Sequence, residues 1–368
     1  MKIRKMIALL LAAAMTASLA ACGSSKPAET TAAAEETQAA EETQAAEAAA
    51  PAEDGAPTLT TTEPVEIVFS HNNPEASAAG QAAVKFKEEL ETRSNGVITV
   101  KIYANGELGT VPENDQALRQ GKIQMVNGTA GGLVDPSLSY FDLPCLVSNN
   151  DEFEALFGRG TELREETEKR FNALGMHVLS LVPGGFGIIS SNKEFRDYAG
   201  MNGLKIRVSE NPIFIEEFTD WGCSPTPVGF GELYVALQQG LVEAQNNTLD
   251  TTVSAALHEQ QKYIINTNHS VQPLGMYMNK EFYDGLPEDV RALIDWVCEN
   301  VIDDYTKQLC ADAQTKAEQT VKDAGLEIID FTDEDRAQMR EAAQPVYDMI
   351  AENVGQDLVD RIAELQAQ

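Results

Sequence analysis

The chain has 368 residues and carries 58 Asp and Glu against 27 Lys and Arg, so its net charge is −31 at pH 7. This length is sufficient for two domains of ordinary size. The acidic charge excludes nucleic acid as a partner, because a phosphate backbone requires a basic surface. It also argues against charge attraction to an anionic lipid surface.

Residues 1–22 are predicted to be a lipoprotein signal peptide. Three basic residues near the start precede the apolar run from Met6 to Ala20, which is too short for a comfortable transmembrane helix. The run ends in Leu19-Ala20-Ala21-Cys22, which resembles a bacterial lipobox whose cysteine is lipidated. The alternative is a plain signal peptide with an incidental Cys22. Under the lipobox interpretation, Cys22 anchors the protein to the membrane on the extracytoplasmic side.

Residues 23–64 are predicted to be a disordered tether. They are rich in Ala, Glu and Thr, contain EETQAA twice in tandem, and have no aromatic residue. Such a segment cannot bury enough apolar surface to offset its ordering entropy. It is expected to hold a folded domain away from the membrane.

Four cysteines follow the tether: Cys145, Cys223, Cys298 and Cys310. The last two lie in one long helical pattern, where twelve residues span about 18 Å, beyond the reach of a disulfide. Buried free thiols are the favoured interpretation. A disulfide between Cys145 and Cys223 stays open.

The folded part opens with an alternation of strand and helix patterns. Strands are predicted at 65–70, 97–103 and 123–126, with helices at 78–92 and 114–120 between them. This order is typical of βαβ units and predicts an α/β fold with a largely parallel sheet.

The alternation continues in the second half. Strands are predicted at 177–182, 204–208 and 241–245, and helices at 153–174, 212–221 and 230–240. A helical pattern then runs almost unbroken from Pro287 to about Gly325. A helix of that length is expected to pass from one domain to another.

Common catalytic and cofactor motifs are not found. His258-Glu259 begins a zinc motif, but Lys262 stands where the second His is required. Gly185-Phe186-Gly187 follows a strand, but Ser190 replaces the third glycine of a dinucleotide loop. The chain is therefore expected to be no enzyme and to use no cofactor and no metal.

Two blocks carry a family resemblance: 197–208 (DYAGMNGLKIRV) and 222–247 (GCSPTPVGFGELYVALQQGLVEAQNN). They are similar to the extracytoplasmic substrate-binding proteins of TRAP transporters, the C4-dicarboxylate-binding or DctP type. The family pattern is a GLKIRV strand, then PTP, then E-x-Y-x-A-L-Q-x-G-x-V-[DE]-[GA]-Q-x-N. Shorter blocks agree at 69–71, 94–96, 106–109, 268–270 and 286–290, so the resemblance covers about 65–366.

The resemblance implies a two-lobed periplasmic-binding-protein-like fold with discontinuous lobes, hinge strands and a long lobe-spanning helix. The expected lobe I is 65–184 plus 273–312, and the expected lobe II is 185–272 plus 313–368. A protein of this type closes on a small organic acid and delivers it to two TRAP membrane permease subunits, driven by an ion gradient and not by ATP. Hinge closure around the ligand is the expected motion.

The resemblance also implies the ligand-binding residues. Arg207 stands where the family pairs an arginine with the ligand carboxylate, and a guanidinium fork matches a carboxylate with two hydrogen bonds. Phe230 matches an aromatic residue that packs on the ligand, and Asn247 closes the Q-x-N block. Asn72 and Thr129 follow strands at positions where polar residues contact the ligand. For Asn247, Asn72 and Thr129 alike, turn formation or capping explains the polar residue equally well.

Gly187 is a departure from the family pattern. Many members carry a second arginine there, in a G-x-R element, whereas this chain reads Gly185-Phe186-Gly187. A dicarboxylate needs two cationic anchors, since a desolvated carboxylate without a counter-charge is costly. The expected ligand therefore has one carboxylate, and its other end is neutral or apolar, as in a hydroxy, keto, sugar or aromatic acid.

Two alternatives stay open at this point. The first is a substrate-binding lipoprotein of an ABC importer, against which the motif at 203–247 argues. The second, of a different class, is a surface lipoprotein that acts as an enzyme or adhesin.

Overall fold

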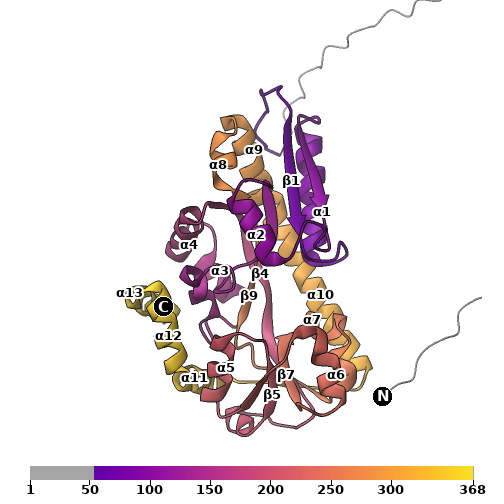
Figure 1. Ribbon diagram of the computed structural model, residues 1–368, viewed down its shortest axis with the longest axis vertical. Coiled ribbons are helices and arrows are strands. Elements are labelled where there is room, and N and C mark those ends of the chain that lie inside the picture. Colours follow the sequence, from indigo (N-terminus) through magenta and orange to yellow (C-terminus); the bar gives the residue numbers. More distant parts are fainter. Residues whose placement is uncertain (1–53, 368) are drawn as a thin grey trace, which may run out of the picture. The chain divides into compact units, whose positions relative to one another are not determined.

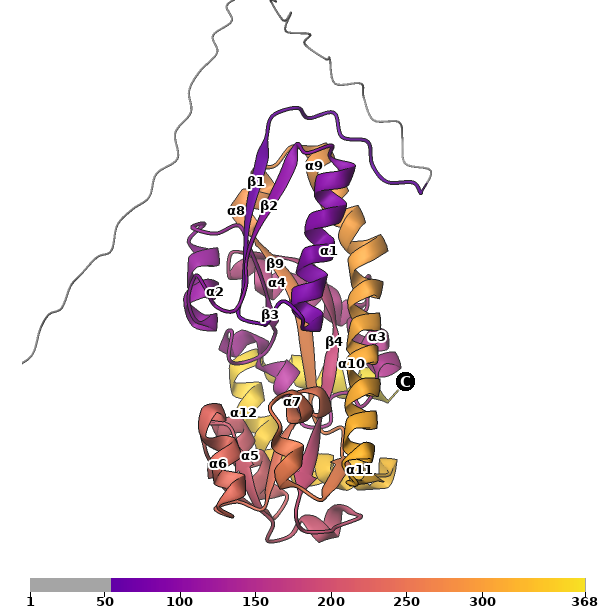
Figure 2. The same cartoon turned by 90° about the vertical axis from the view of Figure 1, so that its right-hand side faces the viewer.

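The computed structural model describes residues 54–367, which belong to one compact unit. The predicted signal peptide, Cys22 and most of the predicted tether lie outside the described residues. Figures 1 and 2 show an α/β arrangement in which sheets are covered by helices. Within residues 54–367, no helix is both long enough and apolar enough to cross a membrane.

The first lobe is built on a sheet with the strand order β2-β1-β3-β9-β4. Its strands β1 (Val65–His71), β2 (Ile98–Tyr103) and β3 (Met125–Thr129) are parallel, as the βαβ pattern predicts. Strand β9 (Val271–Asn279) runs antiparallel to β3. The helices that follow these strands in the chain are α1 (Ala78–Arg93), α2 (Val111–Arg119), α3 (Asn150–Phe157) and α4 (Glu162–Ala173).

The second lobe is built on the far part of β4 together with five further strands. Strands β5 (Lys205–Val208), β6 (Ser224–Pro227) and β7 (Ala244–Thr248) are parallel to one another. Strand β4 (Met176–Ser191) runs antiparallel to β7 and to β8 (Tyr263–Asn266), and β8 pairs in parallel with β10 (Glu327–Asp330). The helices here are α5 (Pro212–Asp220), α6 (Leu233–Gln238), α7 (Leu249–Ser254) and α11 (Asp333–Ala342).

The strand β4 is common to both lobes. From Met176 to Phe186 it pairs with β9, and from Gly187 to Ser191 it pairs with β7. A register shift between Pro183 and Phe186 marks the change of partner. The sheet is therefore mixed and not largely parallel, because two antiparallel strands join two parallel sets.

A long helix also runs along both lobes (Figure 2). It consists of α9 (Glu288–Val297), a π-helical turn (Cys298–Ile302) and α10 (Asp303–Asp323), as the unbroken helical pattern predicted. Asp303 fixes it to the first lobe, since its carboxylate pairs with Arg159 at 2.8 Å and accepts a hydrogen bond from Ser180 of β4. Further along, α10 contacts α7 of the second lobe.

The C-terminal helices depart from the predicted lobe assignment. Apolar side chains of α12 (Gln344–Val354) and α13 (Gln356–Gln366), among them Val346, Ile350 and Ile362, lie in the same core cluster as Tyr140 and Phe171 of the first lobe. This shared cluster favours assigning these two helices to lobe I, whereas the expected lobe II included all of 313–368. The apolar faces of α12 and α13 pack on the first lobe, and the sequence pattern does not identify the surface that they contact.

The end of the predicted tether is ordered. Backbone and hydroxyl groups of Thr60 and Thr61 donate four hydrogen bonds to the carboxylate of Asp289, at 2.6–2.7 Å. Leu59 packs against the core cluster that contains Phe69 and Val290. The described residues 54–64 thus belong to the first lobe, and the tether prediction is wrong for them because hydrogen bonds to Asp289 and one half-buried leucine offset the ordering entropy.

Capping residues set several helix boundaries. The segment predicted as one helix at 153–174 is two helices, because Thr161 begins α4 by accepting a hydrogen bond from the Arg164 amide. Thr110 and Glu113 form a capping box that starts α2 three residues before the predicted position. The four cysteines of the described residues are free, so the Cys145–Cys223 disulfide is absent.

Candidate ligand-binding site

A cavity of about 230 Å³ lies where β3, β5 and β7 end. Ligands of α/β proteins bind at the carboxyl ends of the strands, so this position fits a binding site. Both lobes contribute to its walls. The lining residues are Thr129, Ala130, Gly131, Leu133, Phe141, Asp142, Gly187, Arg207, Ser209, Phe214, Asn246, Asn247, Thr248, Ser270, Val271 and Gln272.

Arg207 is the cation of this cavity. It lies in β5 between Thr226 of β6 and Gln245 of β7, and its residue surface is only 4% exposed. Its Nε donates to the carbonyl of Val228 at 2.8 Å, and it forms no ion pair with any residue of 54–367. Burial lowers the pKa of the guanidinium from its ordinary value, an effect that the charge of Glu210 opposes, and Arg207 stays protonated at neutral pH. A buried positive charge that no carboxylate pairs with directly favours an anionic ligand.

Two further predicted residues lie in the same cavity. Asn247 Nδ2 donates to Gln245 Oε1, and Gln245 Nε2 donates to Ser190 at 2.7 Å, so a buried network fixes the orientation of the Asn247 amide. The Thr129 hydroxyl donates to the Ala130 carbonyl at 3.2 Å. Both side chains offer neutral polar groups beside Arg207.

Gly187 also lines the cavity. It begins the part of β4 that pairs with β7, opposite Thr248, and its amide donates to the Ser270 carbonyl at 2.8 Å. The lining residues include no Lys and no Arg other than Arg207. The second cationic anchor is thus missing from this cavity, in agreement with the departure seen at Gly187.

Two predicted residues do not line this cavity. Phe230 is 51% exposed and lies in the short 3₁₀ helix Phe230–Glu232. Asn72 donates to the Gly109 carbonyl at 2.8 Å and accepts from Asn114 at 2.9 Å, so its amide holds the loop before α2. The turn-forming explanation of Asn72 fits these contacts.

Other lining residues were not selected from the sequence. Phe214 of α5 and Phe141 are the aromatic residues of the cavity, in place of Phe230. Ser270 and Gln272 come from the start of β9, and Ser270 stands in the block 268–270 that agrees with the family. Membership of that block is the one sequence feature that could have identified Ser270. No sequence feature near Phe214 distinguishes it from an ordinary core residue.

One carboxyl group lines the cavity, and a second lies behind it. Asp142 accepts a hydrogen bond from the Gly132 amide at 2.8 Å, and burial raises its pKa to about 6. Behind it lies Glu217 of α5, which is 1% exposed and whose two carboxyl oxygens have no hydrogen-bond partner within 54–367. Burial, with Asp142 and Asp220 nearby, raises the pKa of Glu217 well above 4.5. Glu217 therefore keeps its proton to a higher pH than an exposed glutamate does.

A larger cavity, of about 560 Å³, lies beside α10 and is a poor site for an acid. Its walls carry the carboxylates of Asp151, Asp250 and Glu318 and no Lys, Arg or His. A carboxylate ligand would be repelled there, so volume alone does not identify the binding site.

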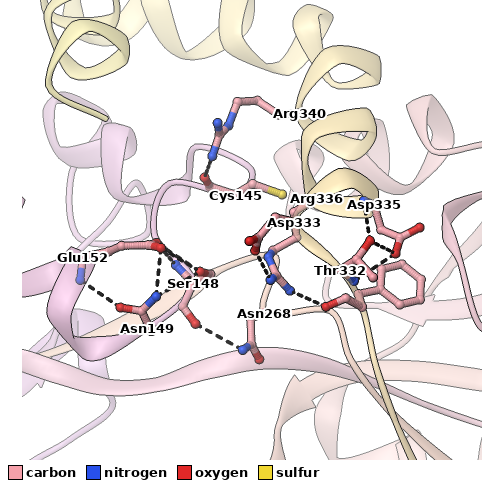
Figure 3. Close-up of polar contacts among 11 residues, drawn as sticks. Cys145, Ser148, Asn149, Glu152, Asn268, Thr332, Asp333, Asp335, Arg336 and Arg340 are labelled. Carbon is pink, nitrogen blue, oxygen red and sulfur yellow. Dashed lines mark hydrogen bonds and ion pairs between the residues drawn. The ribbon is translucent and has the colours of Figure 1, made fainter. Parts of the chain in front are cut away.

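A third cavity, of about 380 Å³, is lined by two arginines whose guanidinium groups already interact with other groups of the protein (Figure 3). Arg340 of α11 donates to the Cys145 carbonyl at 2.8 Å, and Arg336 pairs with Asp333. Asn268 donates to the Ser148 carbonyl at 3.1 Å in the same region. These contacts join the loop before α3 to the second lobe and give this cavity a structural explanation.

Comparisons with known proteins agree with this geometry. The C4-dicarboxylate-binding periplasmic protein DctP of Rhodobacter capsulatus is 30% identical, over 83% of this chain and 92% of that protein. The 2,3-diketo-L-gulonate-binding periplasmic protein YiaO of Escherichia coli is also 30% identical, over 81% of this chain and 91% of that protein.

Solved structures of TRAP periplasmic solute-binding proteins have the same two-lobed fold. One from Ochrobactrum anthropi superposes with a TM-score of 0.79 at 25% identity, covering 83% of this chain and 96% of that one. Another, from Desulfovibrio salexigens with bound orotic acid, gives 0.71 at 26% identity, covering 82% and 98%. The family model described as bacterial extracellular solute-binding protein, family 7, matches residues 69–353, and the chain belongs to this DctP family of TRAP solute-binding proteins.

Proposed function

We propose that this protein binds a small hydroxylated acid with one carboxylate and delivers it to TRAP membrane subunits. The observation that supports this most is Arg207, a buried guanidinium without an ion pair in the wall of a cavity at the strand ends. A carboxylate bound there supplies the ion-pair partner and can receive two parallel hydrogen bonds.

The rest of the cavity favours hydroxyl groups on the ligand. Its polar lining consists mainly of neutral groups that can both donate and accept hydrogen bonds. They are Thr129, Ser209, Asn246, Asn247, Thr248, Ser270 and Gln272. A second ligand carboxylate would find no cation among the described lining residues and would share the cavity with Asp142, at a high desolvation cost.

The relatives leave the ligand class open. One is named as a binder of C4-dicarboxylates and one as a binder of 2,3-diketo-L-gulonate, which has a single carboxylate. The absence of an arginine at Gly187 is the feature that favours the second kind of ligand. The family consists of solute-binding proteins and not of enzymes.

The location proposed for the protein is the outer face of the cell membrane, with Cys22 lipidated. The support is the signal-like run at 6–20 and the small residues before Cys22. The family is extracellular, which agrees with export. Residues between Cys22 and Asp54, whose carboxylate pairs with Arg93 at 2.8 Å, would serve as the tether.

The lobe boundaries are proposed near residues 184 and 273, where β4 and β9 pass between the lobes. The register shift after Pro183 supports this position. We assign 65–184, 273–312 and the helices α12 and α13 to lobe I, and 185–272 with 313–343 to lobe II. The common core cluster of Val346, Ile350 and Tyr140 supports the placement of the C-terminal helices.

A thermal-shift panel at neutral pH tests the proposed function. It compares hydroxylated monocarboxylates (glycerate, erythronate, gluconate, galactonate) with the unsubstituted acids of equal length and with succinate, malate and fumarate. We expect stabilisation by at least one hydroxylated monocarboxylate. Strong stabilisation by the dicarboxylates and none by the monocarboxylates would overturn the proposal. Mass spectrometry of the acid released on denaturing the purified protein would identify the natural ligand.

A further inference from the structure

Gly187 and Ser270 meet at one side of the cavity. A Cβ atom placed on Gly187 would lie 2.2 Å from the hydroxyl oxygen of Ser270 and 3.2 Å from Nε2 of His269. Gly187 is not among the residues with positive φ, so its backbone does not require glycine. Space therefore favours glycine here, since a side chain at 187 fits only if the Ser270 hydroxyl rotates away and the His269 ring gives by a few tenths of an ångström.

The Ser270 backbone is held beside Gly187, and its hydroxyl is unused. The Ser270 carbonyl accepts a hydrogen bond from the Gly187 amide, which holds the two segments together. Among residues 54–367, the Ser270 hydroxyl forms no hydrogen bond, although Ser270 lines the same cavity as Arg207. A hydroxyl at a cavity wall without a partner is available to a polar group of the ligand.

His269 makes this part of the wall rigid and neutral. Its ring is fully buried, packs edge-on against Phe218 and Trp221, and shares a hydrogen bond with the Thr267 hydroxyl at 2.6 Å. Burial lowers its pKa to about 3, so the ring carries no charge at neutral pH. The His269 side of the wall therefore resists a larger side chain at 187, and it offers no cation of its own.

We propose that Ser270, paired with Gly187, is a specificity-determining residue. Its hydroxyl binds a hydroxyl of the acid whose carboxylate Arg207 holds, and it blocks the position from which a cationic side chain at 187 would bind a second carboxylate. This inference rests on the proposed function, because it concerns the end of the ligand that Arg207 does not hold.

Two sets of variants of the full chain test it. In the first, Ser270→Ala is compared with Ser224→Ala, which removes a hydroxyl from the exposed strand β6. The probe is the hydroxylated monocarboxylate that stabilises the unaltered protein most, and binding is measured by calorimetry. We expect about tenfold weaker binding for Ser270→Ala, as for one lost hydrogen bond, and no change for the control. The melting temperature without ligand should stay the same in both.

In the second set, Gly187→Arg is compared with Gly187→Arg/Ser270→Gly, and the probe is succinate. We expect no succinate binding by the unaltered protein or by Gly187→Arg, and a succinate-dependent thermal shift in the double variant. Ser270→Gly alone, expected to leave succinate unbound, shows that the gain comes from the arginine.

Two results would overturn the inference. One is an unchanged dissociation constant for Ser270→Ala. The other is a Gly187→Arg protein that folds and binds succinate as tightly as the double variant does, because Ser270 would then block nothing. If no hydroxylated acid binds the unaltered protein, the proposed function fails by itself. The succinate comparison then still decides whether Ser270 excludes a side chain at 187.

Discussion

Pro183 of β4 and Pro273 of β9 lie opposite each other in the ladder that joins the two lobes. Neither residue has an N–H to donate, so the ladder is weakened at this rung. The register shift follows at once, and three residues after Pro183 the strand changes its partner from β9 to β7. Prolines in the middle of two strands thus mark the place where one sheet ends and the next begins.

Gly185, two residues after Pro183, is predicted to be required by its backbone conformation. Gly185 has φ +148°, and a Cβ there would lie 3.1 Å from Cγ2 of Thr248. We expect Gly185→Ala to lower the free energy of unfolding by about 1–3 kcal/mol, because alanine rarely adopts this conformation. Urea unfolding measures it. Gly229→Ala is the control, since Gly229 has φ −57° and no atom near its Cβ position. Equal stability of the two variants would contradict this account.

Glu217 is predicted to make stability fall as the pH rises. Its pKa in the folded protein lies well above the 4.5 expected of an unfolded chain. Above pH 4.5 the unfolded state releases this proton while the folded state keeps it. The stabilisation by the neutral carboxyl is thus complete at low pH. As the pH rises from 4.5 to the folded pKa, the free energy of unfolding falls by about 1.4 kcal/mol per pH unit.

In the variant Glu217→Gln an amide replaces the carboxyl, so this position does not titrate in either the folded or the unfolded state. We expect the two proteins to have similar free energies of unfolding near pH 4, and the variant to gain relative stability from pH 5 upward. Urea unfolding from pH 4 to 8 checks this. Glu216→Gln, on the same helix α5, should run parallel to the unaltered protein. If the free energy of unfolding of Glu217→Gln also ran parallel to that of the unaltered protein from pH 4 to 8, water would have to reach the Glu217 carboxyl in the folded state.

Arg207→Ala is expected to weaken ligand binding by about 2 kcal/mol or more, about 30-fold, as for truncating one side of a desolvated charge pair. Lys205→Ala is the matched control, because Lys205 lies on the same strand and is exposed. Calorimetry with the ligand found in the thermal-shift panel measures both. An unchanged dissociation constant for Arg207→Ala would remove this residue from the site.

Asp289 is predicted to hold the segment that enters the first lobe. Hydrogen bonds from Thr60 and Thr61 keep the pKa of its carboxyl well below 3.8. In Asp289→Ala we expect amide hydrogen exchange at Thr60 and Thr61 to speed up by about tenfold or more, while β1 keeps its protection. Glu288→Ala, at the neighbouring exposed position, should leave both amides unchanged. Protection retained in Asp289→Ala would show that Leu59 alone anchors the segment.

Cys22→Ala is predicted to move the protein from the membrane to soluble fractions without changing ligand binding. Stable attachment requires more than one acyl chain, and lipidation of Cys22 would supply the attachment site. Fractionation followed by a salt wash measures it. Retention of the Cys22→Ala protein on the membrane after the wash would count against the lipobox.

Several features of this protein follow from the sequence alone. Alternation at 65–70 and 97–103 and the spacing of the helices predicted the parallel strands correctly, because strand and helix periodicity are local properties. The motif at 197–247 identified the family, and it placed Arg207 and Asn247, which the structure brings into one cavity. The unbroken pattern from Pro287 onward predicted the long helix.

Tertiary structure alone decided the remaining features. Ser270 lies 83 residues after Gly187, and only the pairing of β4 with the start of β9 brings its hydroxyl to that glycine. Phe230 was selected for its place in a motif, yet packing leaves it exposed and puts Phe214 in the cavity. Glu217 reads as an ordinary acid of an amphipathic helix, and it becomes buried only where α5 meets Asp142. Periodicity sets which residues form an element, but strand register and the packing of distant segments set which side chains face a cavity.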